Sequence, residues 1–247
     1  MRLLKGLIIL TVVVAALVVG IGLLLPDRAH VERSITVRAK PATVYVALDG
    51  FKRFTQWAPW TRLDPDTQYR HDGPPWGVGA KMTWSSDQPS VGHGSQEIVE
   101  AVPYARIRSR LVFSGFDSEN YSTLTIRADG EGSVVSWAYD ATFHGNLLGR
   151  FFALKLDDWV GKDYEQGLAN LRAMVEPLAD LGDDPLARIE FAEPTAGGAY
   201  ALRIRPEEGA RAESAAAALA AFATVAGLDR DGEPIRATPT GVLQFVH

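Results

Sequence analysis

The sequence predicts an α+β fold: one curved antiparallel sheet wraps around a long C-terminal helix, and an N-terminal transmembrane helix precedes this domain. Three observations support the prediction. The chain begins with a long uncharged apolar run, six strand-like segments follow one another over residues 67–145, and an amphipathic helical pattern covers residues 146–181. Closely spaced strands without intervening helices indicate an antiparallel meander.

Composition limits the classes of function. The chain has 247 residues, 47% of them apolar, which suffices for one large domain or two smaller ones. It contains no cysteine, so disulfides and cysteine-based zinc sites are excluded. The formal charge is −5 and no basic block stands out, which argues against nucleic acid as a partner.

The N-terminal run, Leu7 to Leu25, has 19 residues without a charge, about the thickness of the hydrocarbon core of a bilayer. The alternative is a cleaved signal peptide, but that apolar region usually has about 7–15 residues and a small-residue cleavage site, which "PDRAHVER" lacks. We therefore expect residues 7–25 to be an uncleaved single-pass anchor. Arg2 and Lys5 place residues 1–6 in the cytoplasm and the main domain in the periplasm or outside the cell, although Arg28 and Arg33 weaken this bias.

The elements that follow are predicted in order. Residues 30–39 form a strand, and a helix begins at Pro41 and ends at Gly50. The next stretch gathers large rings at three-residue spacing around Pro59, where a regular helix stops. These rings are Phe51, Phe54, Trp57 and Trp60.

The meander and the long helix come next. Strands are expected within residues 67–73, 79–87, 94–103, 105–115, 119–130 and 133–145. Residues 73–79 are glycine-rich but lack the Lys-Ser/Thr of a phosphate-binding loop, so we expect a turn near the mouth of any cavity. In the long helix, apolar residues recur at intervals of three and four and predict an amphipathic helix, with the charged residues mostly elsewhere. These apolar residues are Leu148, Phe152, Leu156, Trp159, Leu168, Leu171, Val175 and Leu178.

Five segments together resemble a known superfamily. They are "GFKRFTQWAPW", "DGPPWGVGAKMTW", "GHGSQEIVEAVP", "GSVVSWAYDATF" and "GKDYEQGLANLRAMVE". Residues 31–178 resemble the SRPBCC superfamily, the START/birch-pollen-allergen-like helix-grip fold, and within it the bacterial polyketide cyclase/dehydrase-type group. The resemblance implies a cavity between the sheet and the long helix. It leaves the function open, because the superfamily includes lipid carriers, hormone receptors and cyclases.

Strand alternation predicts what lines such a cavity. In residues 133–143, Trp137, Tyr139 and Phe143 share one apolar face, and in residues 105–113 Ser109, Leu111 and Phe113 do the same. Sparse polar groups in an apolar hollow are typical of a small-molecule pocket, although the same residues could fill a solid core. The predicted ligand-binding residues are Trp57, Trp60, Trp84, Ser109, Leu111, Phe113, Trp137, Tyr139, Phe143 and Trp159.

No catalytic residue, metal site or cofactor is predicted. None of the five histidines has metal-ligand spacing. For an enzyme, Tyr139 and His144 are the only candidates for proton transfer.

A second unit is predicted after a linker at residues 179–185. Residues 186–247 weakly resemble one half of a gyrase-inhibitor-like effector-binding domain, a β-α-β-β unit. A single half lacks the two-sided groove of such domains. Homodimer pairing through 186–247, docking against the first domain and a purely stabilising role therefore all stay open.

Three functions follow from these features. The first is a membrane-anchored, extracytoplasmic protein that binds a hydrophobic small molecule or lipid without chemistry. The second is a cyclase- or dehydratase-type enzyme that acts on an apolar substrate in the same cavity. The third is an interaction protein with a filled core and an exposed apolar patch on residues 186–247.

Overall fold

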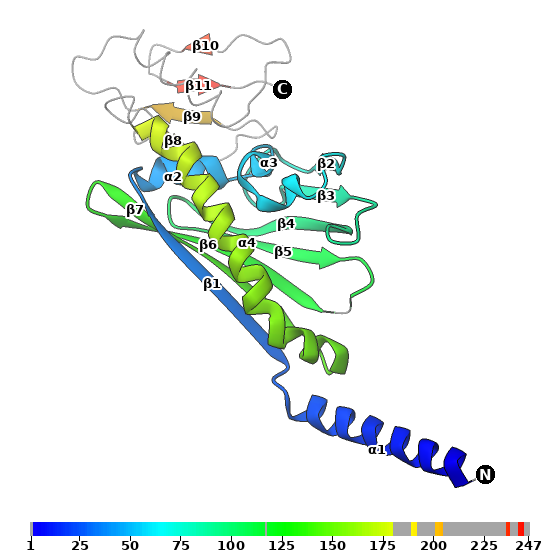
Figure 1. The fold of residues 1–247 in the computed structure, drawn as a ribbon. Helices are drawn as coiled ribbons and strands as arrows, with labels where there is room; N and C mark the ends of the chain where they lie inside the picture. The colour runs from blue at the N-terminus through cyan, green and yellow to red at the C-terminus, as the bar shows by residue number, and fades with distance from the viewer. Residues whose placement is uncertain are drawn as a thin grey trace.

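The computed structural model describes residues 2–116 and 118–179, and beyond them only the strand segments 189–191, 201–204, 236–237 and 242–244. An apolar helix comes first, and a seven-stranded antiparallel sheet with a long helix on one face follows (Figure 1). The helices are α1 (Arg2–Leu24), α2 (Pro41–Leu48), α3 (Phe54–Trp57), the 3-10 turn η1 (Pro59–Arg62) and α4 (Leu147–Ala179). The strands of this sheet are β1 (Arg28–Val37), β2 (Gln68–Asp72), β3 (Lys81–Ser85), β4 (His93–Val102), β5 (Arg106–Phe113), β6 (Glu119–Asp129) and β7 (Gly132–Thr142).

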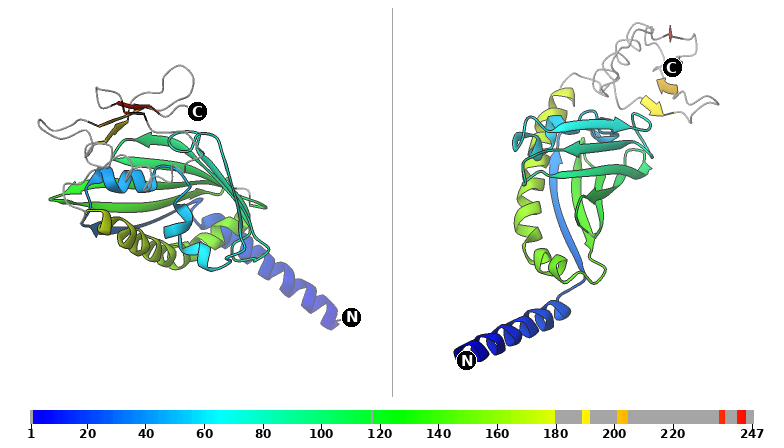
Figure 2. Two further views of the ribbon diagram at one scale, coloured as in Figure 1. Left: turned by 90° about the horizontal axis from the view of Figure 1, so that it is seen from above. Right: turned by 90° about the vertical axis from the view of Figure 1, so that its right-hand side faces the viewer.

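The sheet has the order β1-β7-β6-β5-β4-β3-β2. Apart from β1, which closes the edge against β7, each strand pairs with its neighbour in sequence, so β2–β7 are the predicted meander. Helix α4 runs across one face of the sheet and contacts β1, α2, α3 and η1 (Figure 2). This arrangement is the predicted helix-grip architecture, and the expected elements appear with bounds shifted by a few residues.

Strand register defines two ends of the sheet. At one end, Arg28 of β1 and Glu119 of β6 both pair with Thr142 of β7; we call this the α1 end. At the other end, which we call the far end, Val37 pairs with Ser133 and Asp129 pairs with Gly132. Since β7 has 11 residues, the two ends lie about 30 Å apart.

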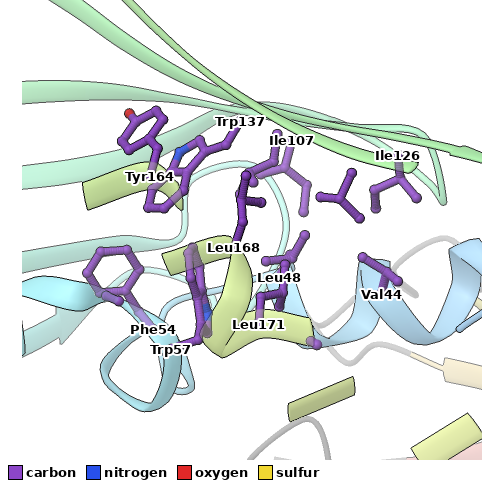
Figure 3. Packing of buried hydrophobic residues seen from close by; sticks show 14 of the residues in the cluster. Val44, Leu48, Phe54, Trp57, Ile107, Ile126, Trp137, Tyr164, Leu168 and Leu171 are labelled. Atoms are coloured by element: carbon purple, nitrogen blue, oxygen red, sulfur yellow. The ribbon is translucent and has the colours of Figure 1, made fainter. Parts of the chain in front are cut away.

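The core lies under the C-terminal half of α4. Trp137 and Tyr164 stack with their ring centroids 3.8 Å apart and their planes at 5°, and the Trp57 ring meets Trp137 edge-on at 5.0 Å. Leu168 and Leu171 of α4 point toward the sheet beside them (Figure 3). Each such side chain contributes about 1.5–3 kcal/mol by leaving water.

The break in the aromatic segment has a structural role. Helix α3 ends at Trp57, and η1 begins at Pro59, whose ring is suited to the first position of a helical turn. The chain therefore turns between the two tryptophans. Trp57 enters the core, whereas Trp60 stays half-buried and donates its Nε1–H to Asp163 Oδ2 of α4 at 2.8 Å.

One expectation is wrong, and one prediction needs more detail. The loop of residues 73–79 joins β2 to β3 at the end of β3 that begins with Lys81, away from the cavity, instead of near its mouth. The predicted apolar stripe of α4 is present, but its burial changes along the helix: Leu148, Phe152 and Trp159 are exposed, while Leu168, Leu171 and Val175 are buried. The reason is that helical periodicity identifies a face, but what covers that face depends on the fold.

The terminal regions are described only in part. Among the described residues, one helix, Leu4–Leu24, is long and apolar enough to cross a membrane, a property that a signal sequence shares. Beyond α4, β8 (Ile189–Phe191), β9 (Ala201–Ile204), β10 (Arg236–Ala237) and β11 (Val242–Gln244) form a sheet of order β10-β11-β9-β8. The predicted helix of this unit lies outside the described residues, as does the linker at 179–185 apart from Ala179.

Candidate functional site: a cavity between the sheet and α4

A cavity of about 570 Å³ lies between the inner face of the sheet and α4. Side chains from α3, η1, strands β2 to β7 and α4 line it. Most of them are apolar or aromatic, including Phe54, Met82 and Leu156. The volume is within the range of about 300–1,000 Å³ that is usual for small-molecule sites.

Seven of the ten predicted ligand-binding residues line this cavity, and three do not. The seven are Trp60, Trp84, Leu111, Phe113, Tyr139, Phe143 and Trp159. Trp57, Ser109 and Trp137 are instead buried beside it, each 2–3% exposed. Tyr164 covers Trp137 by stacking on it, so strand alternation gave the correct face but could not give the depth.

Two amide side chains that the sequence alone did not assign, Gln96 and Asn120, lie on the inner face on either side of Leu111. We call these two amides the polar row. Register places Gln96 of β4 opposite Leu111, and Leu111 opposite Asn120 of β6. Gln96 is 8% exposed and Asn120 is 2% exposed, and both line the cavity. Period-two alternation from Ile98 predicts that Gln96 faces inward. The same alternation from Leu124 predicts that Asn120 faces inward.

The two amides differ in their hydrogen bonds. Asn120 accepts the Tyr139 hydroxyl on Oδ1 at 2.8 Å, and its Nδ2 donates to the carbonyl and hydroxyl oxygens of Ser118. The Gln96 side chain lines the cavity, and no hydrogen bond joins its amide to another residue in the described part of the chain. A hydrogen-bonding group of a ligand in the cavity could therefore pair with this amide.

The ionisable groups of the cavity are neutral or already bonded. Burial raises the pKa of Tyr139 to about 12, and burial also raises the pKa of Tyr164, so both hydroxyls keep their protons at neutral pH. Asp163 accepts the Trp60 indole N–H. His144 lies outside the cavity, on an exposed turn with φ 46° and its Nε2 3.9 Å from Glu119 Oε2.

The mouth of the cavity is marked by lining residues that are exposed. Phe116, between β5 and β6, is 64% exposed, and Leu148, Phe152 and Trp159 of α4 are 72%, 49% and 54% exposed. We call these four side chains the rim. Among the described residues no group of three His, Asp or Glu could hold a metal ion, here or elsewhere.

Comparison with known proteins identifies the family. Residues 28–176, more than half of the chain, match the family described as polyketide cyclase / dehydrase and lipid transport. The chain belongs to this family. The match covers β1 to α4 and confirms the resemblance seen in the sequence, whereas α1 and the C-terminal unit lie outside it.

Similar solved structures share low sequence identity with the chain. A protein from Chromobacterium violaceum is 21% identical with a TM-score of 0.45, covering 62% of this chain and 99% of its own. Ara h 8.0201 is 14% identical with a TM-score of 0.41, and the match covers 62% of this chain and 97% of Ara h 8.0201. The di-domain ARO/CYC StfQ from the steffimycin biosynthetic pathway is 13% identical with a TM-score of 0.47, covering 62% and 52%. A search of curated proteins found no relative.

Proposed function

We propose that the protein binds a hydrophobic small molecule or lipid in this cavity, without chemistry, as a membrane-anchored extracytoplasmic binding protein. The observation that carries the proposal is the cavity itself, about 570 Å³ and lined mainly by apolar and aromatic side chains. The alternative of an interaction protein predicts a filled core in this domain, and the cavity does not fit that prediction. In this proposal α1 is the anchor, and the charges of Arg2 and Lys5 favour a cytoplasmic N-terminus.

The polar row narrows the class of ligand. Gln96 offers an amide N–H and a carbonyl oxygen within mainly apolar walls. The ligand that fits is therefore a molecule with an apolar body and one hydrogen-bonding group, such as a hydroxyl, carbonyl or carboxyl. The lining includes no Lys or Arg from the described chain, so a fully ionised head group would lack a counter-charge inside.

The same lining favours binding over catalysis. Among the lining residues of the described chain, Asp163 is the sole carboxylate, and it is bonded to Trp60. Tyr139 keeps its proton at neutral pH, and His144 lies outside the cavity. A cyclase or dehydratase would need a general acid or base in reach of its substrate.

The first test is native mass spectrometry of the full chain, purified gently from its membrane in detergent. We expect a discrete additional mass, and its identity names the ligand class. We expect Leu111→Trp to fill the cavity and remove this mass, because Leu111 of β5 lines the cavity. Val112→Trp is the matched control, because Val112 is the next residue and is 50% exposed on the outer face.

The outcome separates the hypotheses. A bound mass in the wild type and Val112→Trp, lost in Leu111→Trp, supports the proposal. A bare protein that takes up no fluorescent apolar probe contradicts it. A chemically altered molecule released after incubation would favour the enzyme.

A second prediction concerns Gln96. We expect Gln96→Leu to weaken binding of a fluorescent fatty alcohol by about 5–10-fold, which corresponds to one hydrogen bond of about 1 kcal/mol. Binding of a matched hydrocarbon probe should be unchanged or tighter. Equal weakening of both probes would mean that the substitution changes the shape of the cavity and not its polarity.

A further inference from the structure

We propose that the rim of the cavity rests on the same bilayer that holds α1, so that the ligand moves directly between this bilayer and the cavity. The passage of ligand rests on the proposed binding function. The contact between rim and bilayer rests on separate observations, given below.

The first observation is the short connection. Helix α1 ends at Leu24 and β1 begins at Arg28, so three residues separate them. Even a fully extended segment of this length spans only about 10 Å. The domain therefore stays close to the surface from which α1 emerges.

The second observation is that the junction is packed. Arg150 Nη1 donates to the carbonyl oxygens of Leu23 and Leu25 at 3.2 and 3.1 Å, and Arg150 Nε donates to Asp27 Oδ1 at 3.2 Å. Gly22 is buried, with the Phe151 ring 3.0 Å from the position that a Cβ would occupy. The last turn of α1 is thus held on the first turns of α4.

The third observation is where the rim lies. Leu147 and Phe151 of α4 lie next to Gly22 of α1. The rim residues Leu148 and Phe152 directly follow them in the sequence. Phe116 follows β5, whose last residue, Phe113, pairs with Gly94 at the α1 end of the sheet. Figures 1 and 2 show α1 leaving from this end, opposite to the β6–β7 hairpin.

The chemistry of this end suits a lipid surface. Leu148 is 72% exposed and Phe116 is 64% exposed, an arrangement that is unfavourable in water and favourable at a membrane interface. Charged residues nearby form pairs of opposite sign, Arg150 with Asp27 and Lys155 with Asp158. We therefore expect the contact to form on zwitterionic lipid as well, without anionic head groups.

The absence of cysteine from the sequence allows a direct test. The variants Phe116→Cys, Leu148→Cys and, as control, Glu131→Cys each carry a single thiol that takes a fluorescent label. Glu131 is exposed in the β6–β7 hairpin at the far end. Each full-length variant is placed in phosphatidylcholine vesicles that contain brominated phosphatidylcholine, which quenches only fluorophores that touch lipid.

We expect labels at 116 and 148 to lose most of their fluorescence and the label at 131 to lose almost none. Equal, weak quenching at all three positions would overturn the inference. Uptake of the fatty alcohol probe by unlabelled wild-type protein in the same vesicles is a separate readout. Uptake without quenching would leave the binding function standing and remove the contact with the bilayer, whereas quenching without uptake would do the reverse.

Discussion

Arg33 lies on the inner face of the sheet, opposite Trp137, yet it carries a charge. Its Nε donates to Glu165 Oε1 at 2.8 Å and its Nη1 to Asp157 Oδ1 at 3.0 Å. The two carboxylates lie one helical turn before and after Gly161, whose missing side chain makes room for the guanidinium. Arg33 thereby ties β1 to α4, and it holds the pKa of Asp157 below its usual value.

Two glycines of α4 allow a comparison at single positions. A Cβ at Gly167 would lie 2.6 Å from Cζ3 of Trp137, a ring that is held on its other sides. We expect Gly167→Ala to lower the free energy of unfolding by about 1–3 kcal/mol through overpacking. At Gly161 the obstacle is the flexible end of Arg33, and alanine gains about 1 kcal/mol of helix propensity, so Gly161→Ala should change stability by less than about 1 kcal/mol.

Urea unfolding in detergent, followed by tryptophan fluorescence, measures both glycine variants. Equal effects would mean that the Trp137 stack can move aside as easily as an arginine side chain. That result would contradict the view that the aromatic core is rigid.

At the scale of elements, the C-terminal end of α2 is joined to the loop of residues 73–79. Asp49 follows α2, and its Oδ1 accepts the Gly77 N–H at 2.9 Å. Gly50 has φ 102°, and a Cβ there would lie 2.5 Å from the Pro75 carbonyl oxygen. This glycine therefore allows both the left-handed backbone and the close approach of the loop.

Burial gives Asp49 a pH-dependent effect on stability. Desolvation raises its pKa from 3.8 to about 6. Below pH 3.8 the carboxyl is protonated in both folded and unfolded chains, so its contribution is constant. Between about pH 4 and 6 the free energy of unfolding falls as pH rises, by about 3 kcal/mol in total, because the ionised form is more costly in the fold.

Asp49→Asn should remove this dependence, since the amide keeps an oxygen for Gly77 but cannot ionise. Unfolding measured at pH 4.5 and pH 7 tests the prediction. Asp66→Asn, at an exposed position, is the control and should unfold with the pH dependence of the wild type. If Asp49→Asn does so as well, then Asp49 is solvated in the native protein.

Helix α4 shows what sequence periodicity can and cannot predict. Its apolar stripe was correctly found, but Leu171 ends in the core and Leu148 ends at the mouth of a cavity. The repeat is the same in both halves, because a helix presents one face regardless of what lies opposite. The difference arises from α2, α3 and η1, which pack against α4 and close the space over its C-terminal half.

For the molecule as a whole, the order of elements was predictable, because turns, prolines and alternation are local signals. The face of Tyr139 and Phe143 was predictable for the same reason. The depth of Trp137 was not, because it depends on Tyr164, which lies 27 residues further along the chain and stacks on it. Gln96 was within reach of alternation, but its place in the cavity wall depends on how β4, its two neighbouring strands and α4 come together.

With α1 in a membrane, as we propose, the three-residue connection between α1 and β1 would also set how far the mouth of the cavity can reach. The sheet is only about 30 Å long, and the rim of the cavity lies at its α1 end. A second membrane beyond that distance could not then present lipid to the mouth. The cavity would then receive its ligand only by lateral diffusion within one leaflet. The fraction of protein with bound ligand would follow the mole fraction of ligand in that leaflet. Delivery of the ligand across water would require a separate, diffusible carrier.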